Sequence, residues 1–139
     1  MAAKRQDRNG EWVYLTFDIA QIAGSVSGVV ITNGNAASDA TVMQPLNSID
    51  DFSILDPRAL YSISYANNPE LGRKKSAELL VPDRLSLDFL LYITAINQQT
   101  LAKVEGIVRA FNRQSFRYQV KPNWFFSGNT QPGEGSFFE

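Results

Sequence analysis

The chain has 139 residues, the size of one globular domain, and 44% of them are hydrophobic. Its 13 Lys and Arg residues against 14 Asp and Glu give a net charge of −1, so no overall basic field attracts nucleic acid. Cys and His are both absent, which excludes disulfides, thiolate metal sites and catalysis by either side chain. Any chemistry must therefore rest on carboxylates, Tyr, Lys, Arg, hydroxyls or backbone amides.

Short elements are predicted along the first half of the chain. Residues 12–17 are aromatic and β-branched, which predicts a strand, and residues 19–23 predict a short helix. A second strand over 29–32 stops at Asn33-Gly34, a strong turn signal. An Asp-Pro pair then gives an N-cap followed by a helix over 58–65.

The second half predicts longer elements. Residues 77–81 predict a short strand, and the apolar run 89–96 suits a central strand covered on both faces. The clearest helix spans 97–112, with its apolar residues on one stripe. Alternation over 116–121 predicts a half-buried strand. Because strands and helices mix without regular βαβ alternation, we expect the α+β class, with a mixed sheet flanked by helices in a single domain.

The domain organisation follows from composition. Residues 1–10 are polar and predict a mobile N-terminus, residues 11–126 carry the regular patterns of one domain, and residues 127–139 predict a loose C-terminal tail. The chain shows no apolar run near the length that a membrane span needs and no apolar leader segment. We therefore expect no membrane association and a cytoplasmic location.

One segment places three cations before a carboxylate. Arg73, Lys74 and Lys75 precede Glu78, which opens an apolar strand. A carboxylate beside apolar side chains is costly unless it is paired or used, so Glu78 is a candidate catalytic residue at a cleft. The alternative is a surface carboxylate that pairs with Lys75 or Arg84, since exposed charge pairs are common and weak.

Several segments together resemble one known family. Residues 30–37 read V-I-T-N-G-N-A-A, residues 75–81 read K-S-A-E-L-L-V, and residues 82–85 read P-D-R-L. These resemble the T-D-x-N-A, R-x-A-E-F-L-V and P-D-R-V segments of the DarT family, toxins that ADP-ribosylate thymidine in single-stranded DNA. Supporting segments follow in the family's order over residues 15–17, 60–65 and 120–126.

The resemblance covers residues 12–126 and implies the C-terminal half of an ADP-ribosyltransferase fold. The family's His-bearing first strand, which binds NAD, and its Arg-containing loops, which bind phosphate and substrate, have no counterpart here. It thus implies a partial or split transferase without its N-terminal, NAD-binding half, needing either a complementary chain or a second copy of itself. NAD is the implied co-substrate, the residues that would bind it are left open, and no metal is implied.

Residue roles follow from the matched positions. Glu78 is the implied catalytic carboxylate, while Lys74, Lys75, Arg73 and Asn35 are the implied contacts to nucleic acid. Single-stranded DNA and a macrodomain antitoxin are the implied partners. Two alternatives stay open: a catalytically inactive relative that binds protein or nucleic acid, and a phage structural or assembly protein.

Two further clusters of charged residues have open or structural interpretations. Five cations over 100–122 either line a phosphate-binding surface or form solvated faces of a helix and a strand. Four Asp residues over 39–56 fit no calcium-loop spacing and are better explained as caps and turns, so no metal site is expected.

Overall fold

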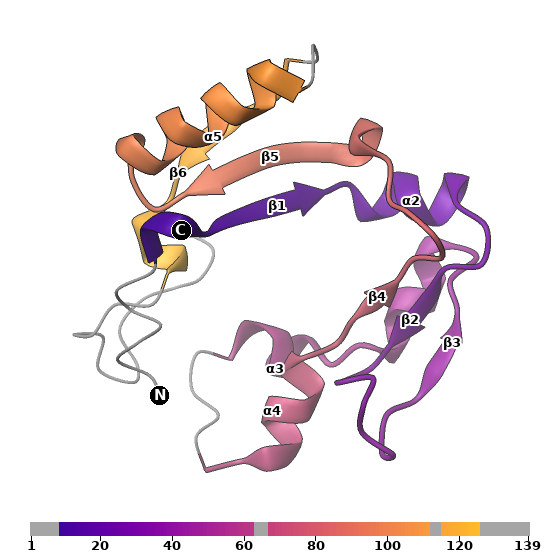
Figure 1. The fold of residues 1–139 in the computed structure, drawn as a ribbon. Coiled ribbons are helices and arrows are strands. Elements are labelled where there is room, and N and C mark those ends of the chain that lie inside the picture. Colours follow the sequence, from indigo (N-terminus) through magenta and orange to yellow (C-terminus); the bar gives the residue numbers. More distant parts are fainter. Residues whose placement is uncertain (1–8, 63–66, 112–114, 126–139) are drawn as a thin grey trace. The chain divides into compact units, whose positions relative to one another are not determined.

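The structure is a computed structural model that describes residues 9–62, 67–111 and 115–125 (Figure 1). It divides into two units, which are described separately. The terminal unit combines Met1–Asp18 with Leu90–Glu139, and the central unit is Ile19–Phe89. Among the described residues, no helix is long and apolar enough to cross a membrane.

A three-stranded mixed sheet organises the terminal unit. Its central strand β5 (Leu90–Ala95) pairs antiparallel with β1 (Val13–Phe17) and parallel with β6 (Tyr118–Val120). Parallel neighbours need a crossover, and helix α5 (Gln98–Phe111) supplies it, packing on both β5 and β6. The predicted mixed sheet and its central strand are therefore confirmed. The unit also contains two short 3₁₀ helices, η1 (Asn9–Glu11) and η4 (Pro122–Trp124).

Burial in the terminal unit is uneven along its elements. Strand β5 is buried at its end, Ile93–Ala95, but Leu91 is exposed, so the prediction that both faces are covered was wrong for the first half of the strand. The pairing with β6 is likewise confined to those last residues. On α5, Leu101 is buried, whereas Ile107 and Phe111 are 61% and 89% exposed.

The central unit contains a second sheet, of order β3-β2-β4, in which both pairings are antiparallel. Its core includes Ile22, Val29, Ile31, Leu46 and Ala59. In chain order its elements are α2 (Ile19–Ser25), β2 (Val30–Thr32), β3 (Met43–Pro45), η2 (Ile49–Ile54), α3 (Pro57–Tyr61), α4 (Pro69–Lys75), β4 (Leu79–Leu80) and η3 (Leu87–Phe89). The α+β class predicted from the pattern is confirmed by both units.

Helices α3 and α4 differ from the sequence prediction. Asp56 and Pro57 begin α3 as predicted, but the helix ends at Tyr61 because Ser62 adopts an extended C-cap. The remainder of the predicted span falls largely outside the described residues. Helix α4 was not predicted: Asn68 caps it by accepting the backbone N–H of Leu71 at 3.0 Å, with proline at its first position.

Candidate functional site

Glu78 lies immediately before β4, and its backbone is held by Thr32 of β2. The Glu78 N–H donates to the Thr32 hydroxyl at 2.8 Å, and the Glu78 carbonyl accepts the Thr32 N–H at 2.9 Å. Thr32 is completely buried, whereas Glu78 is exposed. The sheet thus fixes the backbone of this residue while its carboxylate faces solvent.

The carboxylate of Glu78 binds a backbone amide rather than only solvent. Its Oε2 accepts the N–H of Ala36 at 2.9 Å. Ala36 belongs to the β2–β3 loop, residues 33–42. Asn33 closes the base of this loop, because its N–H donates to the Val42 carbonyl at 3.1 Å and its side-chain oxygen accepts the Val42 N–H at 2.9 Å. A closed loop therefore presents a donor to the carboxylate.

Arg73, in the last turn of α4, holds the same loop. Its Nη1 donates to the Thr41 hydroxyl at 2.9 Å and to the Asn33 side-chain oxygen at 3.4 Å, while its carbonyl accepts the Asn35 N–H at 2.9 Å. Arg73 lies so close to Gly34 that a Cβ added at this glycine would be 2.9 Å from the Arg73 carbonyl oxygen. Glycine is required there by close contact between the two segments.

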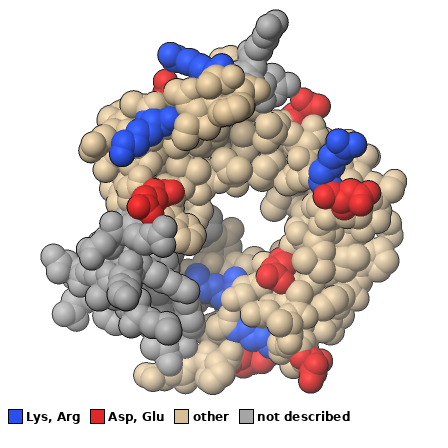
Figure 2. All heavy atoms as spheres, in the orientation of Figure 1, with Lys and Arg blue, Asp and Glu red and all other residues tan. Residues whose placement is uncertain are grey.

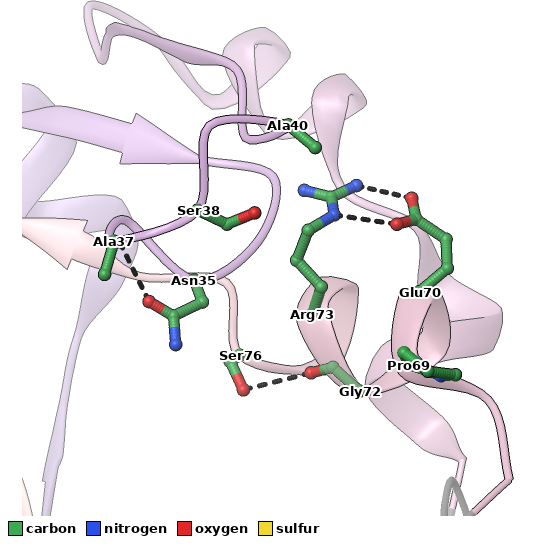
Figure 3. Close-up of a pocket in the computed structure, with 9 residues that line it drawn as sticks. All are labelled: Asn35, Ala37, Ser38, Ala40, Pro69, Glu70, Gly72, Arg73 and Ser76. Atoms are coloured by element: carbon green, nitrogen blue, oxygen red, sulfur yellow. Dashed lines mark hydrogen bonds and ion pairs between the residues drawn. The ribbon is translucent and has the colours of Figure 1, made fainter.

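The other edge of the Arg73 guanidinium donates to Glu70 of the same helix. Nε and Nη2 donate to the two carboxylate oxygens at 3.0 and 2.7 Å, a bidentate pair that Figure 3 shows beside the loop. The hydrogen bond to Arg73 lowers the pKa of Glu70, and the same bond raises the pKa of Arg73. With only 11% of its side chain exposed, Arg73 is mainly a bridge within the protein.

Lys74 and Lys75 reach the neighbouring helix α3. Lys74 Nζ lies 3.0 Å from Asp56, the N-cap residue of α3, and this hydrogen bond is the main reason that the pKa of Asp56 is lowered. Lys75 Nζ donates to the carbonyl oxygens of Leu60, at 3.2 Å, and Ser62. The three consecutive cations therefore join α4 to α3 and to the β2–β3 loop.

An open depression of about 480 Å³ lies between the β2–β3 loop and α4. Figure 3 shows Asn35 and Ser38 on the loop side and Arg73 and Glu70 on the helix side. Asn35 is exposed, and its side-chain oxygen accepts the N–H of Ala37 at 2.9 Å, which leaves its amide NH₂ for another partner. The lining combines one cation and one anion with small apolar residues such as Ala37 and Ala40.

Charge elsewhere is dispersed. On the face shown in Figure 2, basic and acidic side chains alternate with neutral surface. Arg109 of the second basic cluster lies on α5 and pairs with Glu105 at 3.3 Å, and Arg113 lies outside the described residues. Among the residues that the structure describes, no group of three acidic, His or Cys side chains could hold a metal ion.

The structure brings Glu78, Asn35 and Arg73 to the β2–β3 loop, whereas Lys74 and Lys75 turn toward α3. Sequence reasoning missed Thr32, Ala36 and Thr41, whose roles arise from hydrogen bonds between residues far apart in the chain. Thr32 and Ala36 lie in the segment 30–37 that resembles the family's T-D-x-N-A motif, and this match is the signal that could have found them.

Solved structures share this fold. Thermus sp. 2.9 DarT in complex with NAD+ matches with a TM-score of 0.75 and 19% identity, covering 82% of this chain and 57% of that one. The same protein in complex with ADP-ribosylated ssDNA gives a TM-score of 0.72 and 20% identity, covering 82% and 54%. Thermosipho africanus DarTG in complex with ADP-ribose gives 0.63 and 18%, covering 86% and 30%. No curated protein matches the chain.

The architecture thus resembles part of the fold seen in these DarT complexes. A family model described as "ssDNA thymidine ADP-ribosyltransferase, DarT" matches residues 1–126, and the chain belongs to this family. It spans little more than half the length of the Thermus protein.

Proposed function

We propose that this chain is the Glu-bearing part of an ADP-ribosyltransferase that modifies thymidine in single-stranded DNA with NAD, and that it acts together with a second chain. One observation carries the proposal: the family match extends over Glu78, whose carboxylate is exposed yet held by the Ala36 N–H at 2.9 Å. The match to Thermus sp. 2.9 DarT covers 57% of that chain.

The chemistry requires an anion of this kind. Cleavage of the nicotinamide–ribose bond leaves positive charge on the sugar, as in glycoside hydrolysis. Glu78 stabilises that cation and takes the proton from the attacking thymine nitrogen, which then bonds to the ribose carbon while nicotinamide departs. Because the Ala36 N–H binds Oε2, we assign the contact with the reactants to Oε1, which accepts no bond from Ala36.

Nucleic acid would approach along α4 and the β2–β3 loop. Asn35 offers its side-chain NH₂, and Lys74 retains ammonium hydrogens beyond the one bound to Asp56. Lys75, which is bound to α3, follows Lys74 in the last turn of α4. Arg73 keeps one Nη2 hydrogen besides its bonds to Glu70 and the loop. We propose that these residues contact phosphate or base, with local positive charge compensating for the chain's net charge of −1.

The second chain supplies the NAD-binding half in our proposal, either as a complementary polypeptide or as another copy. The exposed Ile107 and Phe111 on α5 are apolar surface suited to such an association. A macrodomain antitoxin and a cytoplasmic location complete the proposal. A monomer by light scattering at high concentration that also fails to bind a complementary half would contradict the association.

The decisive experiment mixes the chain with NAD and a thymine-containing single strand, with and without the N-terminal part of Thermus sp. 2.9 DarT as a separate chain. Mass spectrometry of the oligonucleotide should show added ADP-ribose only with that second chain. Glu78→Gln should reduce transfer by about a hundredfold or more. Asp50→Asn, at an exposed carboxylate of η2, should leave transfer unchanged. No transfer in either mixture, or transfer that survives Glu78→Gln, contradicts the proposal.

If no ADP-ribose is transferred, the alternatives are an inactive relative that binds nucleic acid or protein, and a structural protein. An electrophoretic shift that weakens steeply between two salt concentrations would indicate an inactive relative that binds nucleic acid, because phosphate contacts release counterions. No shift at either concentration would favour a protein-binding or structural role.

A further inference from the structure

One peptide group connects Glu78 to the rest of the β2–β3 loop. The N–H of the Asn35–Ala36 peptide donates to Glu78 Oε2 at 2.9 Å. The carbonyl of the same peptide accepts the Thr41 hydroxyl at 2.7 Å and the Ser38 N–H at 3.0 Å. A peptide group is planar, so the direction of its carbonyl fixes the direction of its N–H. Whatever orients the Asn35 carbonyl therefore orients the donor to Glu78.

Arg73 determines which way the Thr41 hydroxyl points. The guanidinium can only donate, and its Nη1 donates to Thr41 Oγ1 at 2.9 Å. The hydroxyl hydrogen must then point elsewhere, and the Asn35 carbonyl receives it. Arg73 also accepts the Asn35 N–H through its own carbonyl, and Glu70 holds its guanidinium from the other side.

We infer that Thr41 and Arg73 are positioning residues, which hold the Asn35–Ala36 peptide so that its N–H keeps the Glu78 carboxylate in its reactive orientation. The relay runs from Glu70 through Arg73, Thr41 and the peptide to Glu78, and each bond polarises the next. This role rests on the proposed function of Glu78, and it adds a task within the protein to the nucleic-acid contact expected of Arg73.

Amide hydrogen exchange tests the relay without requiring activity. Thr41→Val keeps the side-chain shape but removes the hydroxyl, so the Ala36 amide should lose protection by about five- to tenfold, as expected for one hydrogen bond. Thr41→Ser should restore protection, and Ser53→Ala, at an exposed hydroxyl residue of η2, should not change it. The Leu46 amide, bonded to the Val29 carbonyl at 2.8 Å in the same unit, reports general loosening.

The inference is overturned if Thr41→Val leaves Ala36 protection unchanged, if Leu46 loses protection equally, or if Thr41→Ser restores nothing. In the transfer assay, Thr41→Val should lower kcat about tenfold with little change in KM, because the loop would still bind the substrates. If the wild-type mixture shows no transfer while the exchange differences persist, the proposed function fails and the relay stands.

Discussion

Thr32 and Glu78 are joined by their backbones and by a buried hydroxyl. The Thr32 N–H donates to the Glu78 carbonyl at 2.9 Å, and the Thr32 hydroxyl accepts the Glu78 N–H at 2.8 Å. The same hydroxyl donates to the Gly34 carbonyl at 2.6 Å. One completely buried side chain therefore links the residue before β4 to the first turn of the β2–β3 loop.

Replacing Thr32 by Val should destabilise the protein. The substitution preserves shape but leaves the part-buried N–H of Glu78 and the buried Gly34 carbonyl without this partner, which costs about 1 to 3 kcal/mol. Urea unfolding followed by circular dichroism would show a lower midpoint, and Thr32→Ser should recover most of the loss. Thr16→Val on β1 is the matched control, and an equal loss there would show that the Thr32 hydroxyl has no special role.

Two glycine substitutions should have opposite effects on thermal stability. In Gly34→Ala the new Cβ would lie 2.9 Å from the Arg73 carbonyl oxygen, so the loop or α4 must shift at a cost of about 1 to 3 kcal/mol. In Gly106→Ala nothing lies within 4 Å of the new Cβ, and the helix α5 gains up to about 1 kcal/mol. Melting temperatures that change equally would contradict the close contact.

Acid should weaken the attachment of α4 to α3 through Asp56. Its pKa is lowered from an ordinary 3.8, chiefly by the hydrogen bond from Lys74 and then by the Ala59 N–H. A carboxyl with a lowered pKa stabilises the folded state above its unfolded pKa. This contribution is lost as pH falls below about 4 and through the folded pKa.

Replacing Lys74 tests whether its hydrogen bond lowers the pKa of Asp56. In Lys74→Met the pKa of Asp56, followed by NMR of its carboxyl carbon, should rise toward the ordinary value, and thermal stability should fall less steeply on acidification. Added salt should reduce the difference between variant and wild type, because the pair is partly exposed. An unchanged Asp56 titration in the variant would show that the pair is absent in solution.

Two apolar residues of α5 should differ in their contribution to stability. Leu101 is 7% exposed, so Leu101→Ala should cost about 2 to 5 kcal/mol by creating a cavity. Phe111 is 89% exposed, so Phe111→Ser should change the free energy of unfolding by less than about 0.5 kcal/mol in the isolated chain. Denaturant titrations of both variants test the difference, and a large loss for Phe111→Ser would indicate that this surface is already covered.

Local signals accounted for much of the fold. The strands near 12–17, 29–32 and 89–96 and the helix over 97–112 match β1, β2, β5 and α5, because apolar periodicity and caps act within a few residues. Asn97 caps α5 by accepting the Thr100 N–H at 2.8 Å. Strand β3 escaped prediction since its three residues, Met43–Pro45, form a strand only by pairing with β2.

The sequence by itself determined the α+β class, the family and the position of the candidate carboxylate at Glu78, because these depend on residue identity and order. Only the tertiary structure decided how that carboxylate is held. Thr32 and Ala36 hydrogen-bond to Glu78 directly, and Arg73 acts on it through Thr41. These hydrogen bonds join residues up to 46 positions apart. Hydrogen bonds of this kind depend on distance and direction in space, which neither composition nor spacing along the chain specifies.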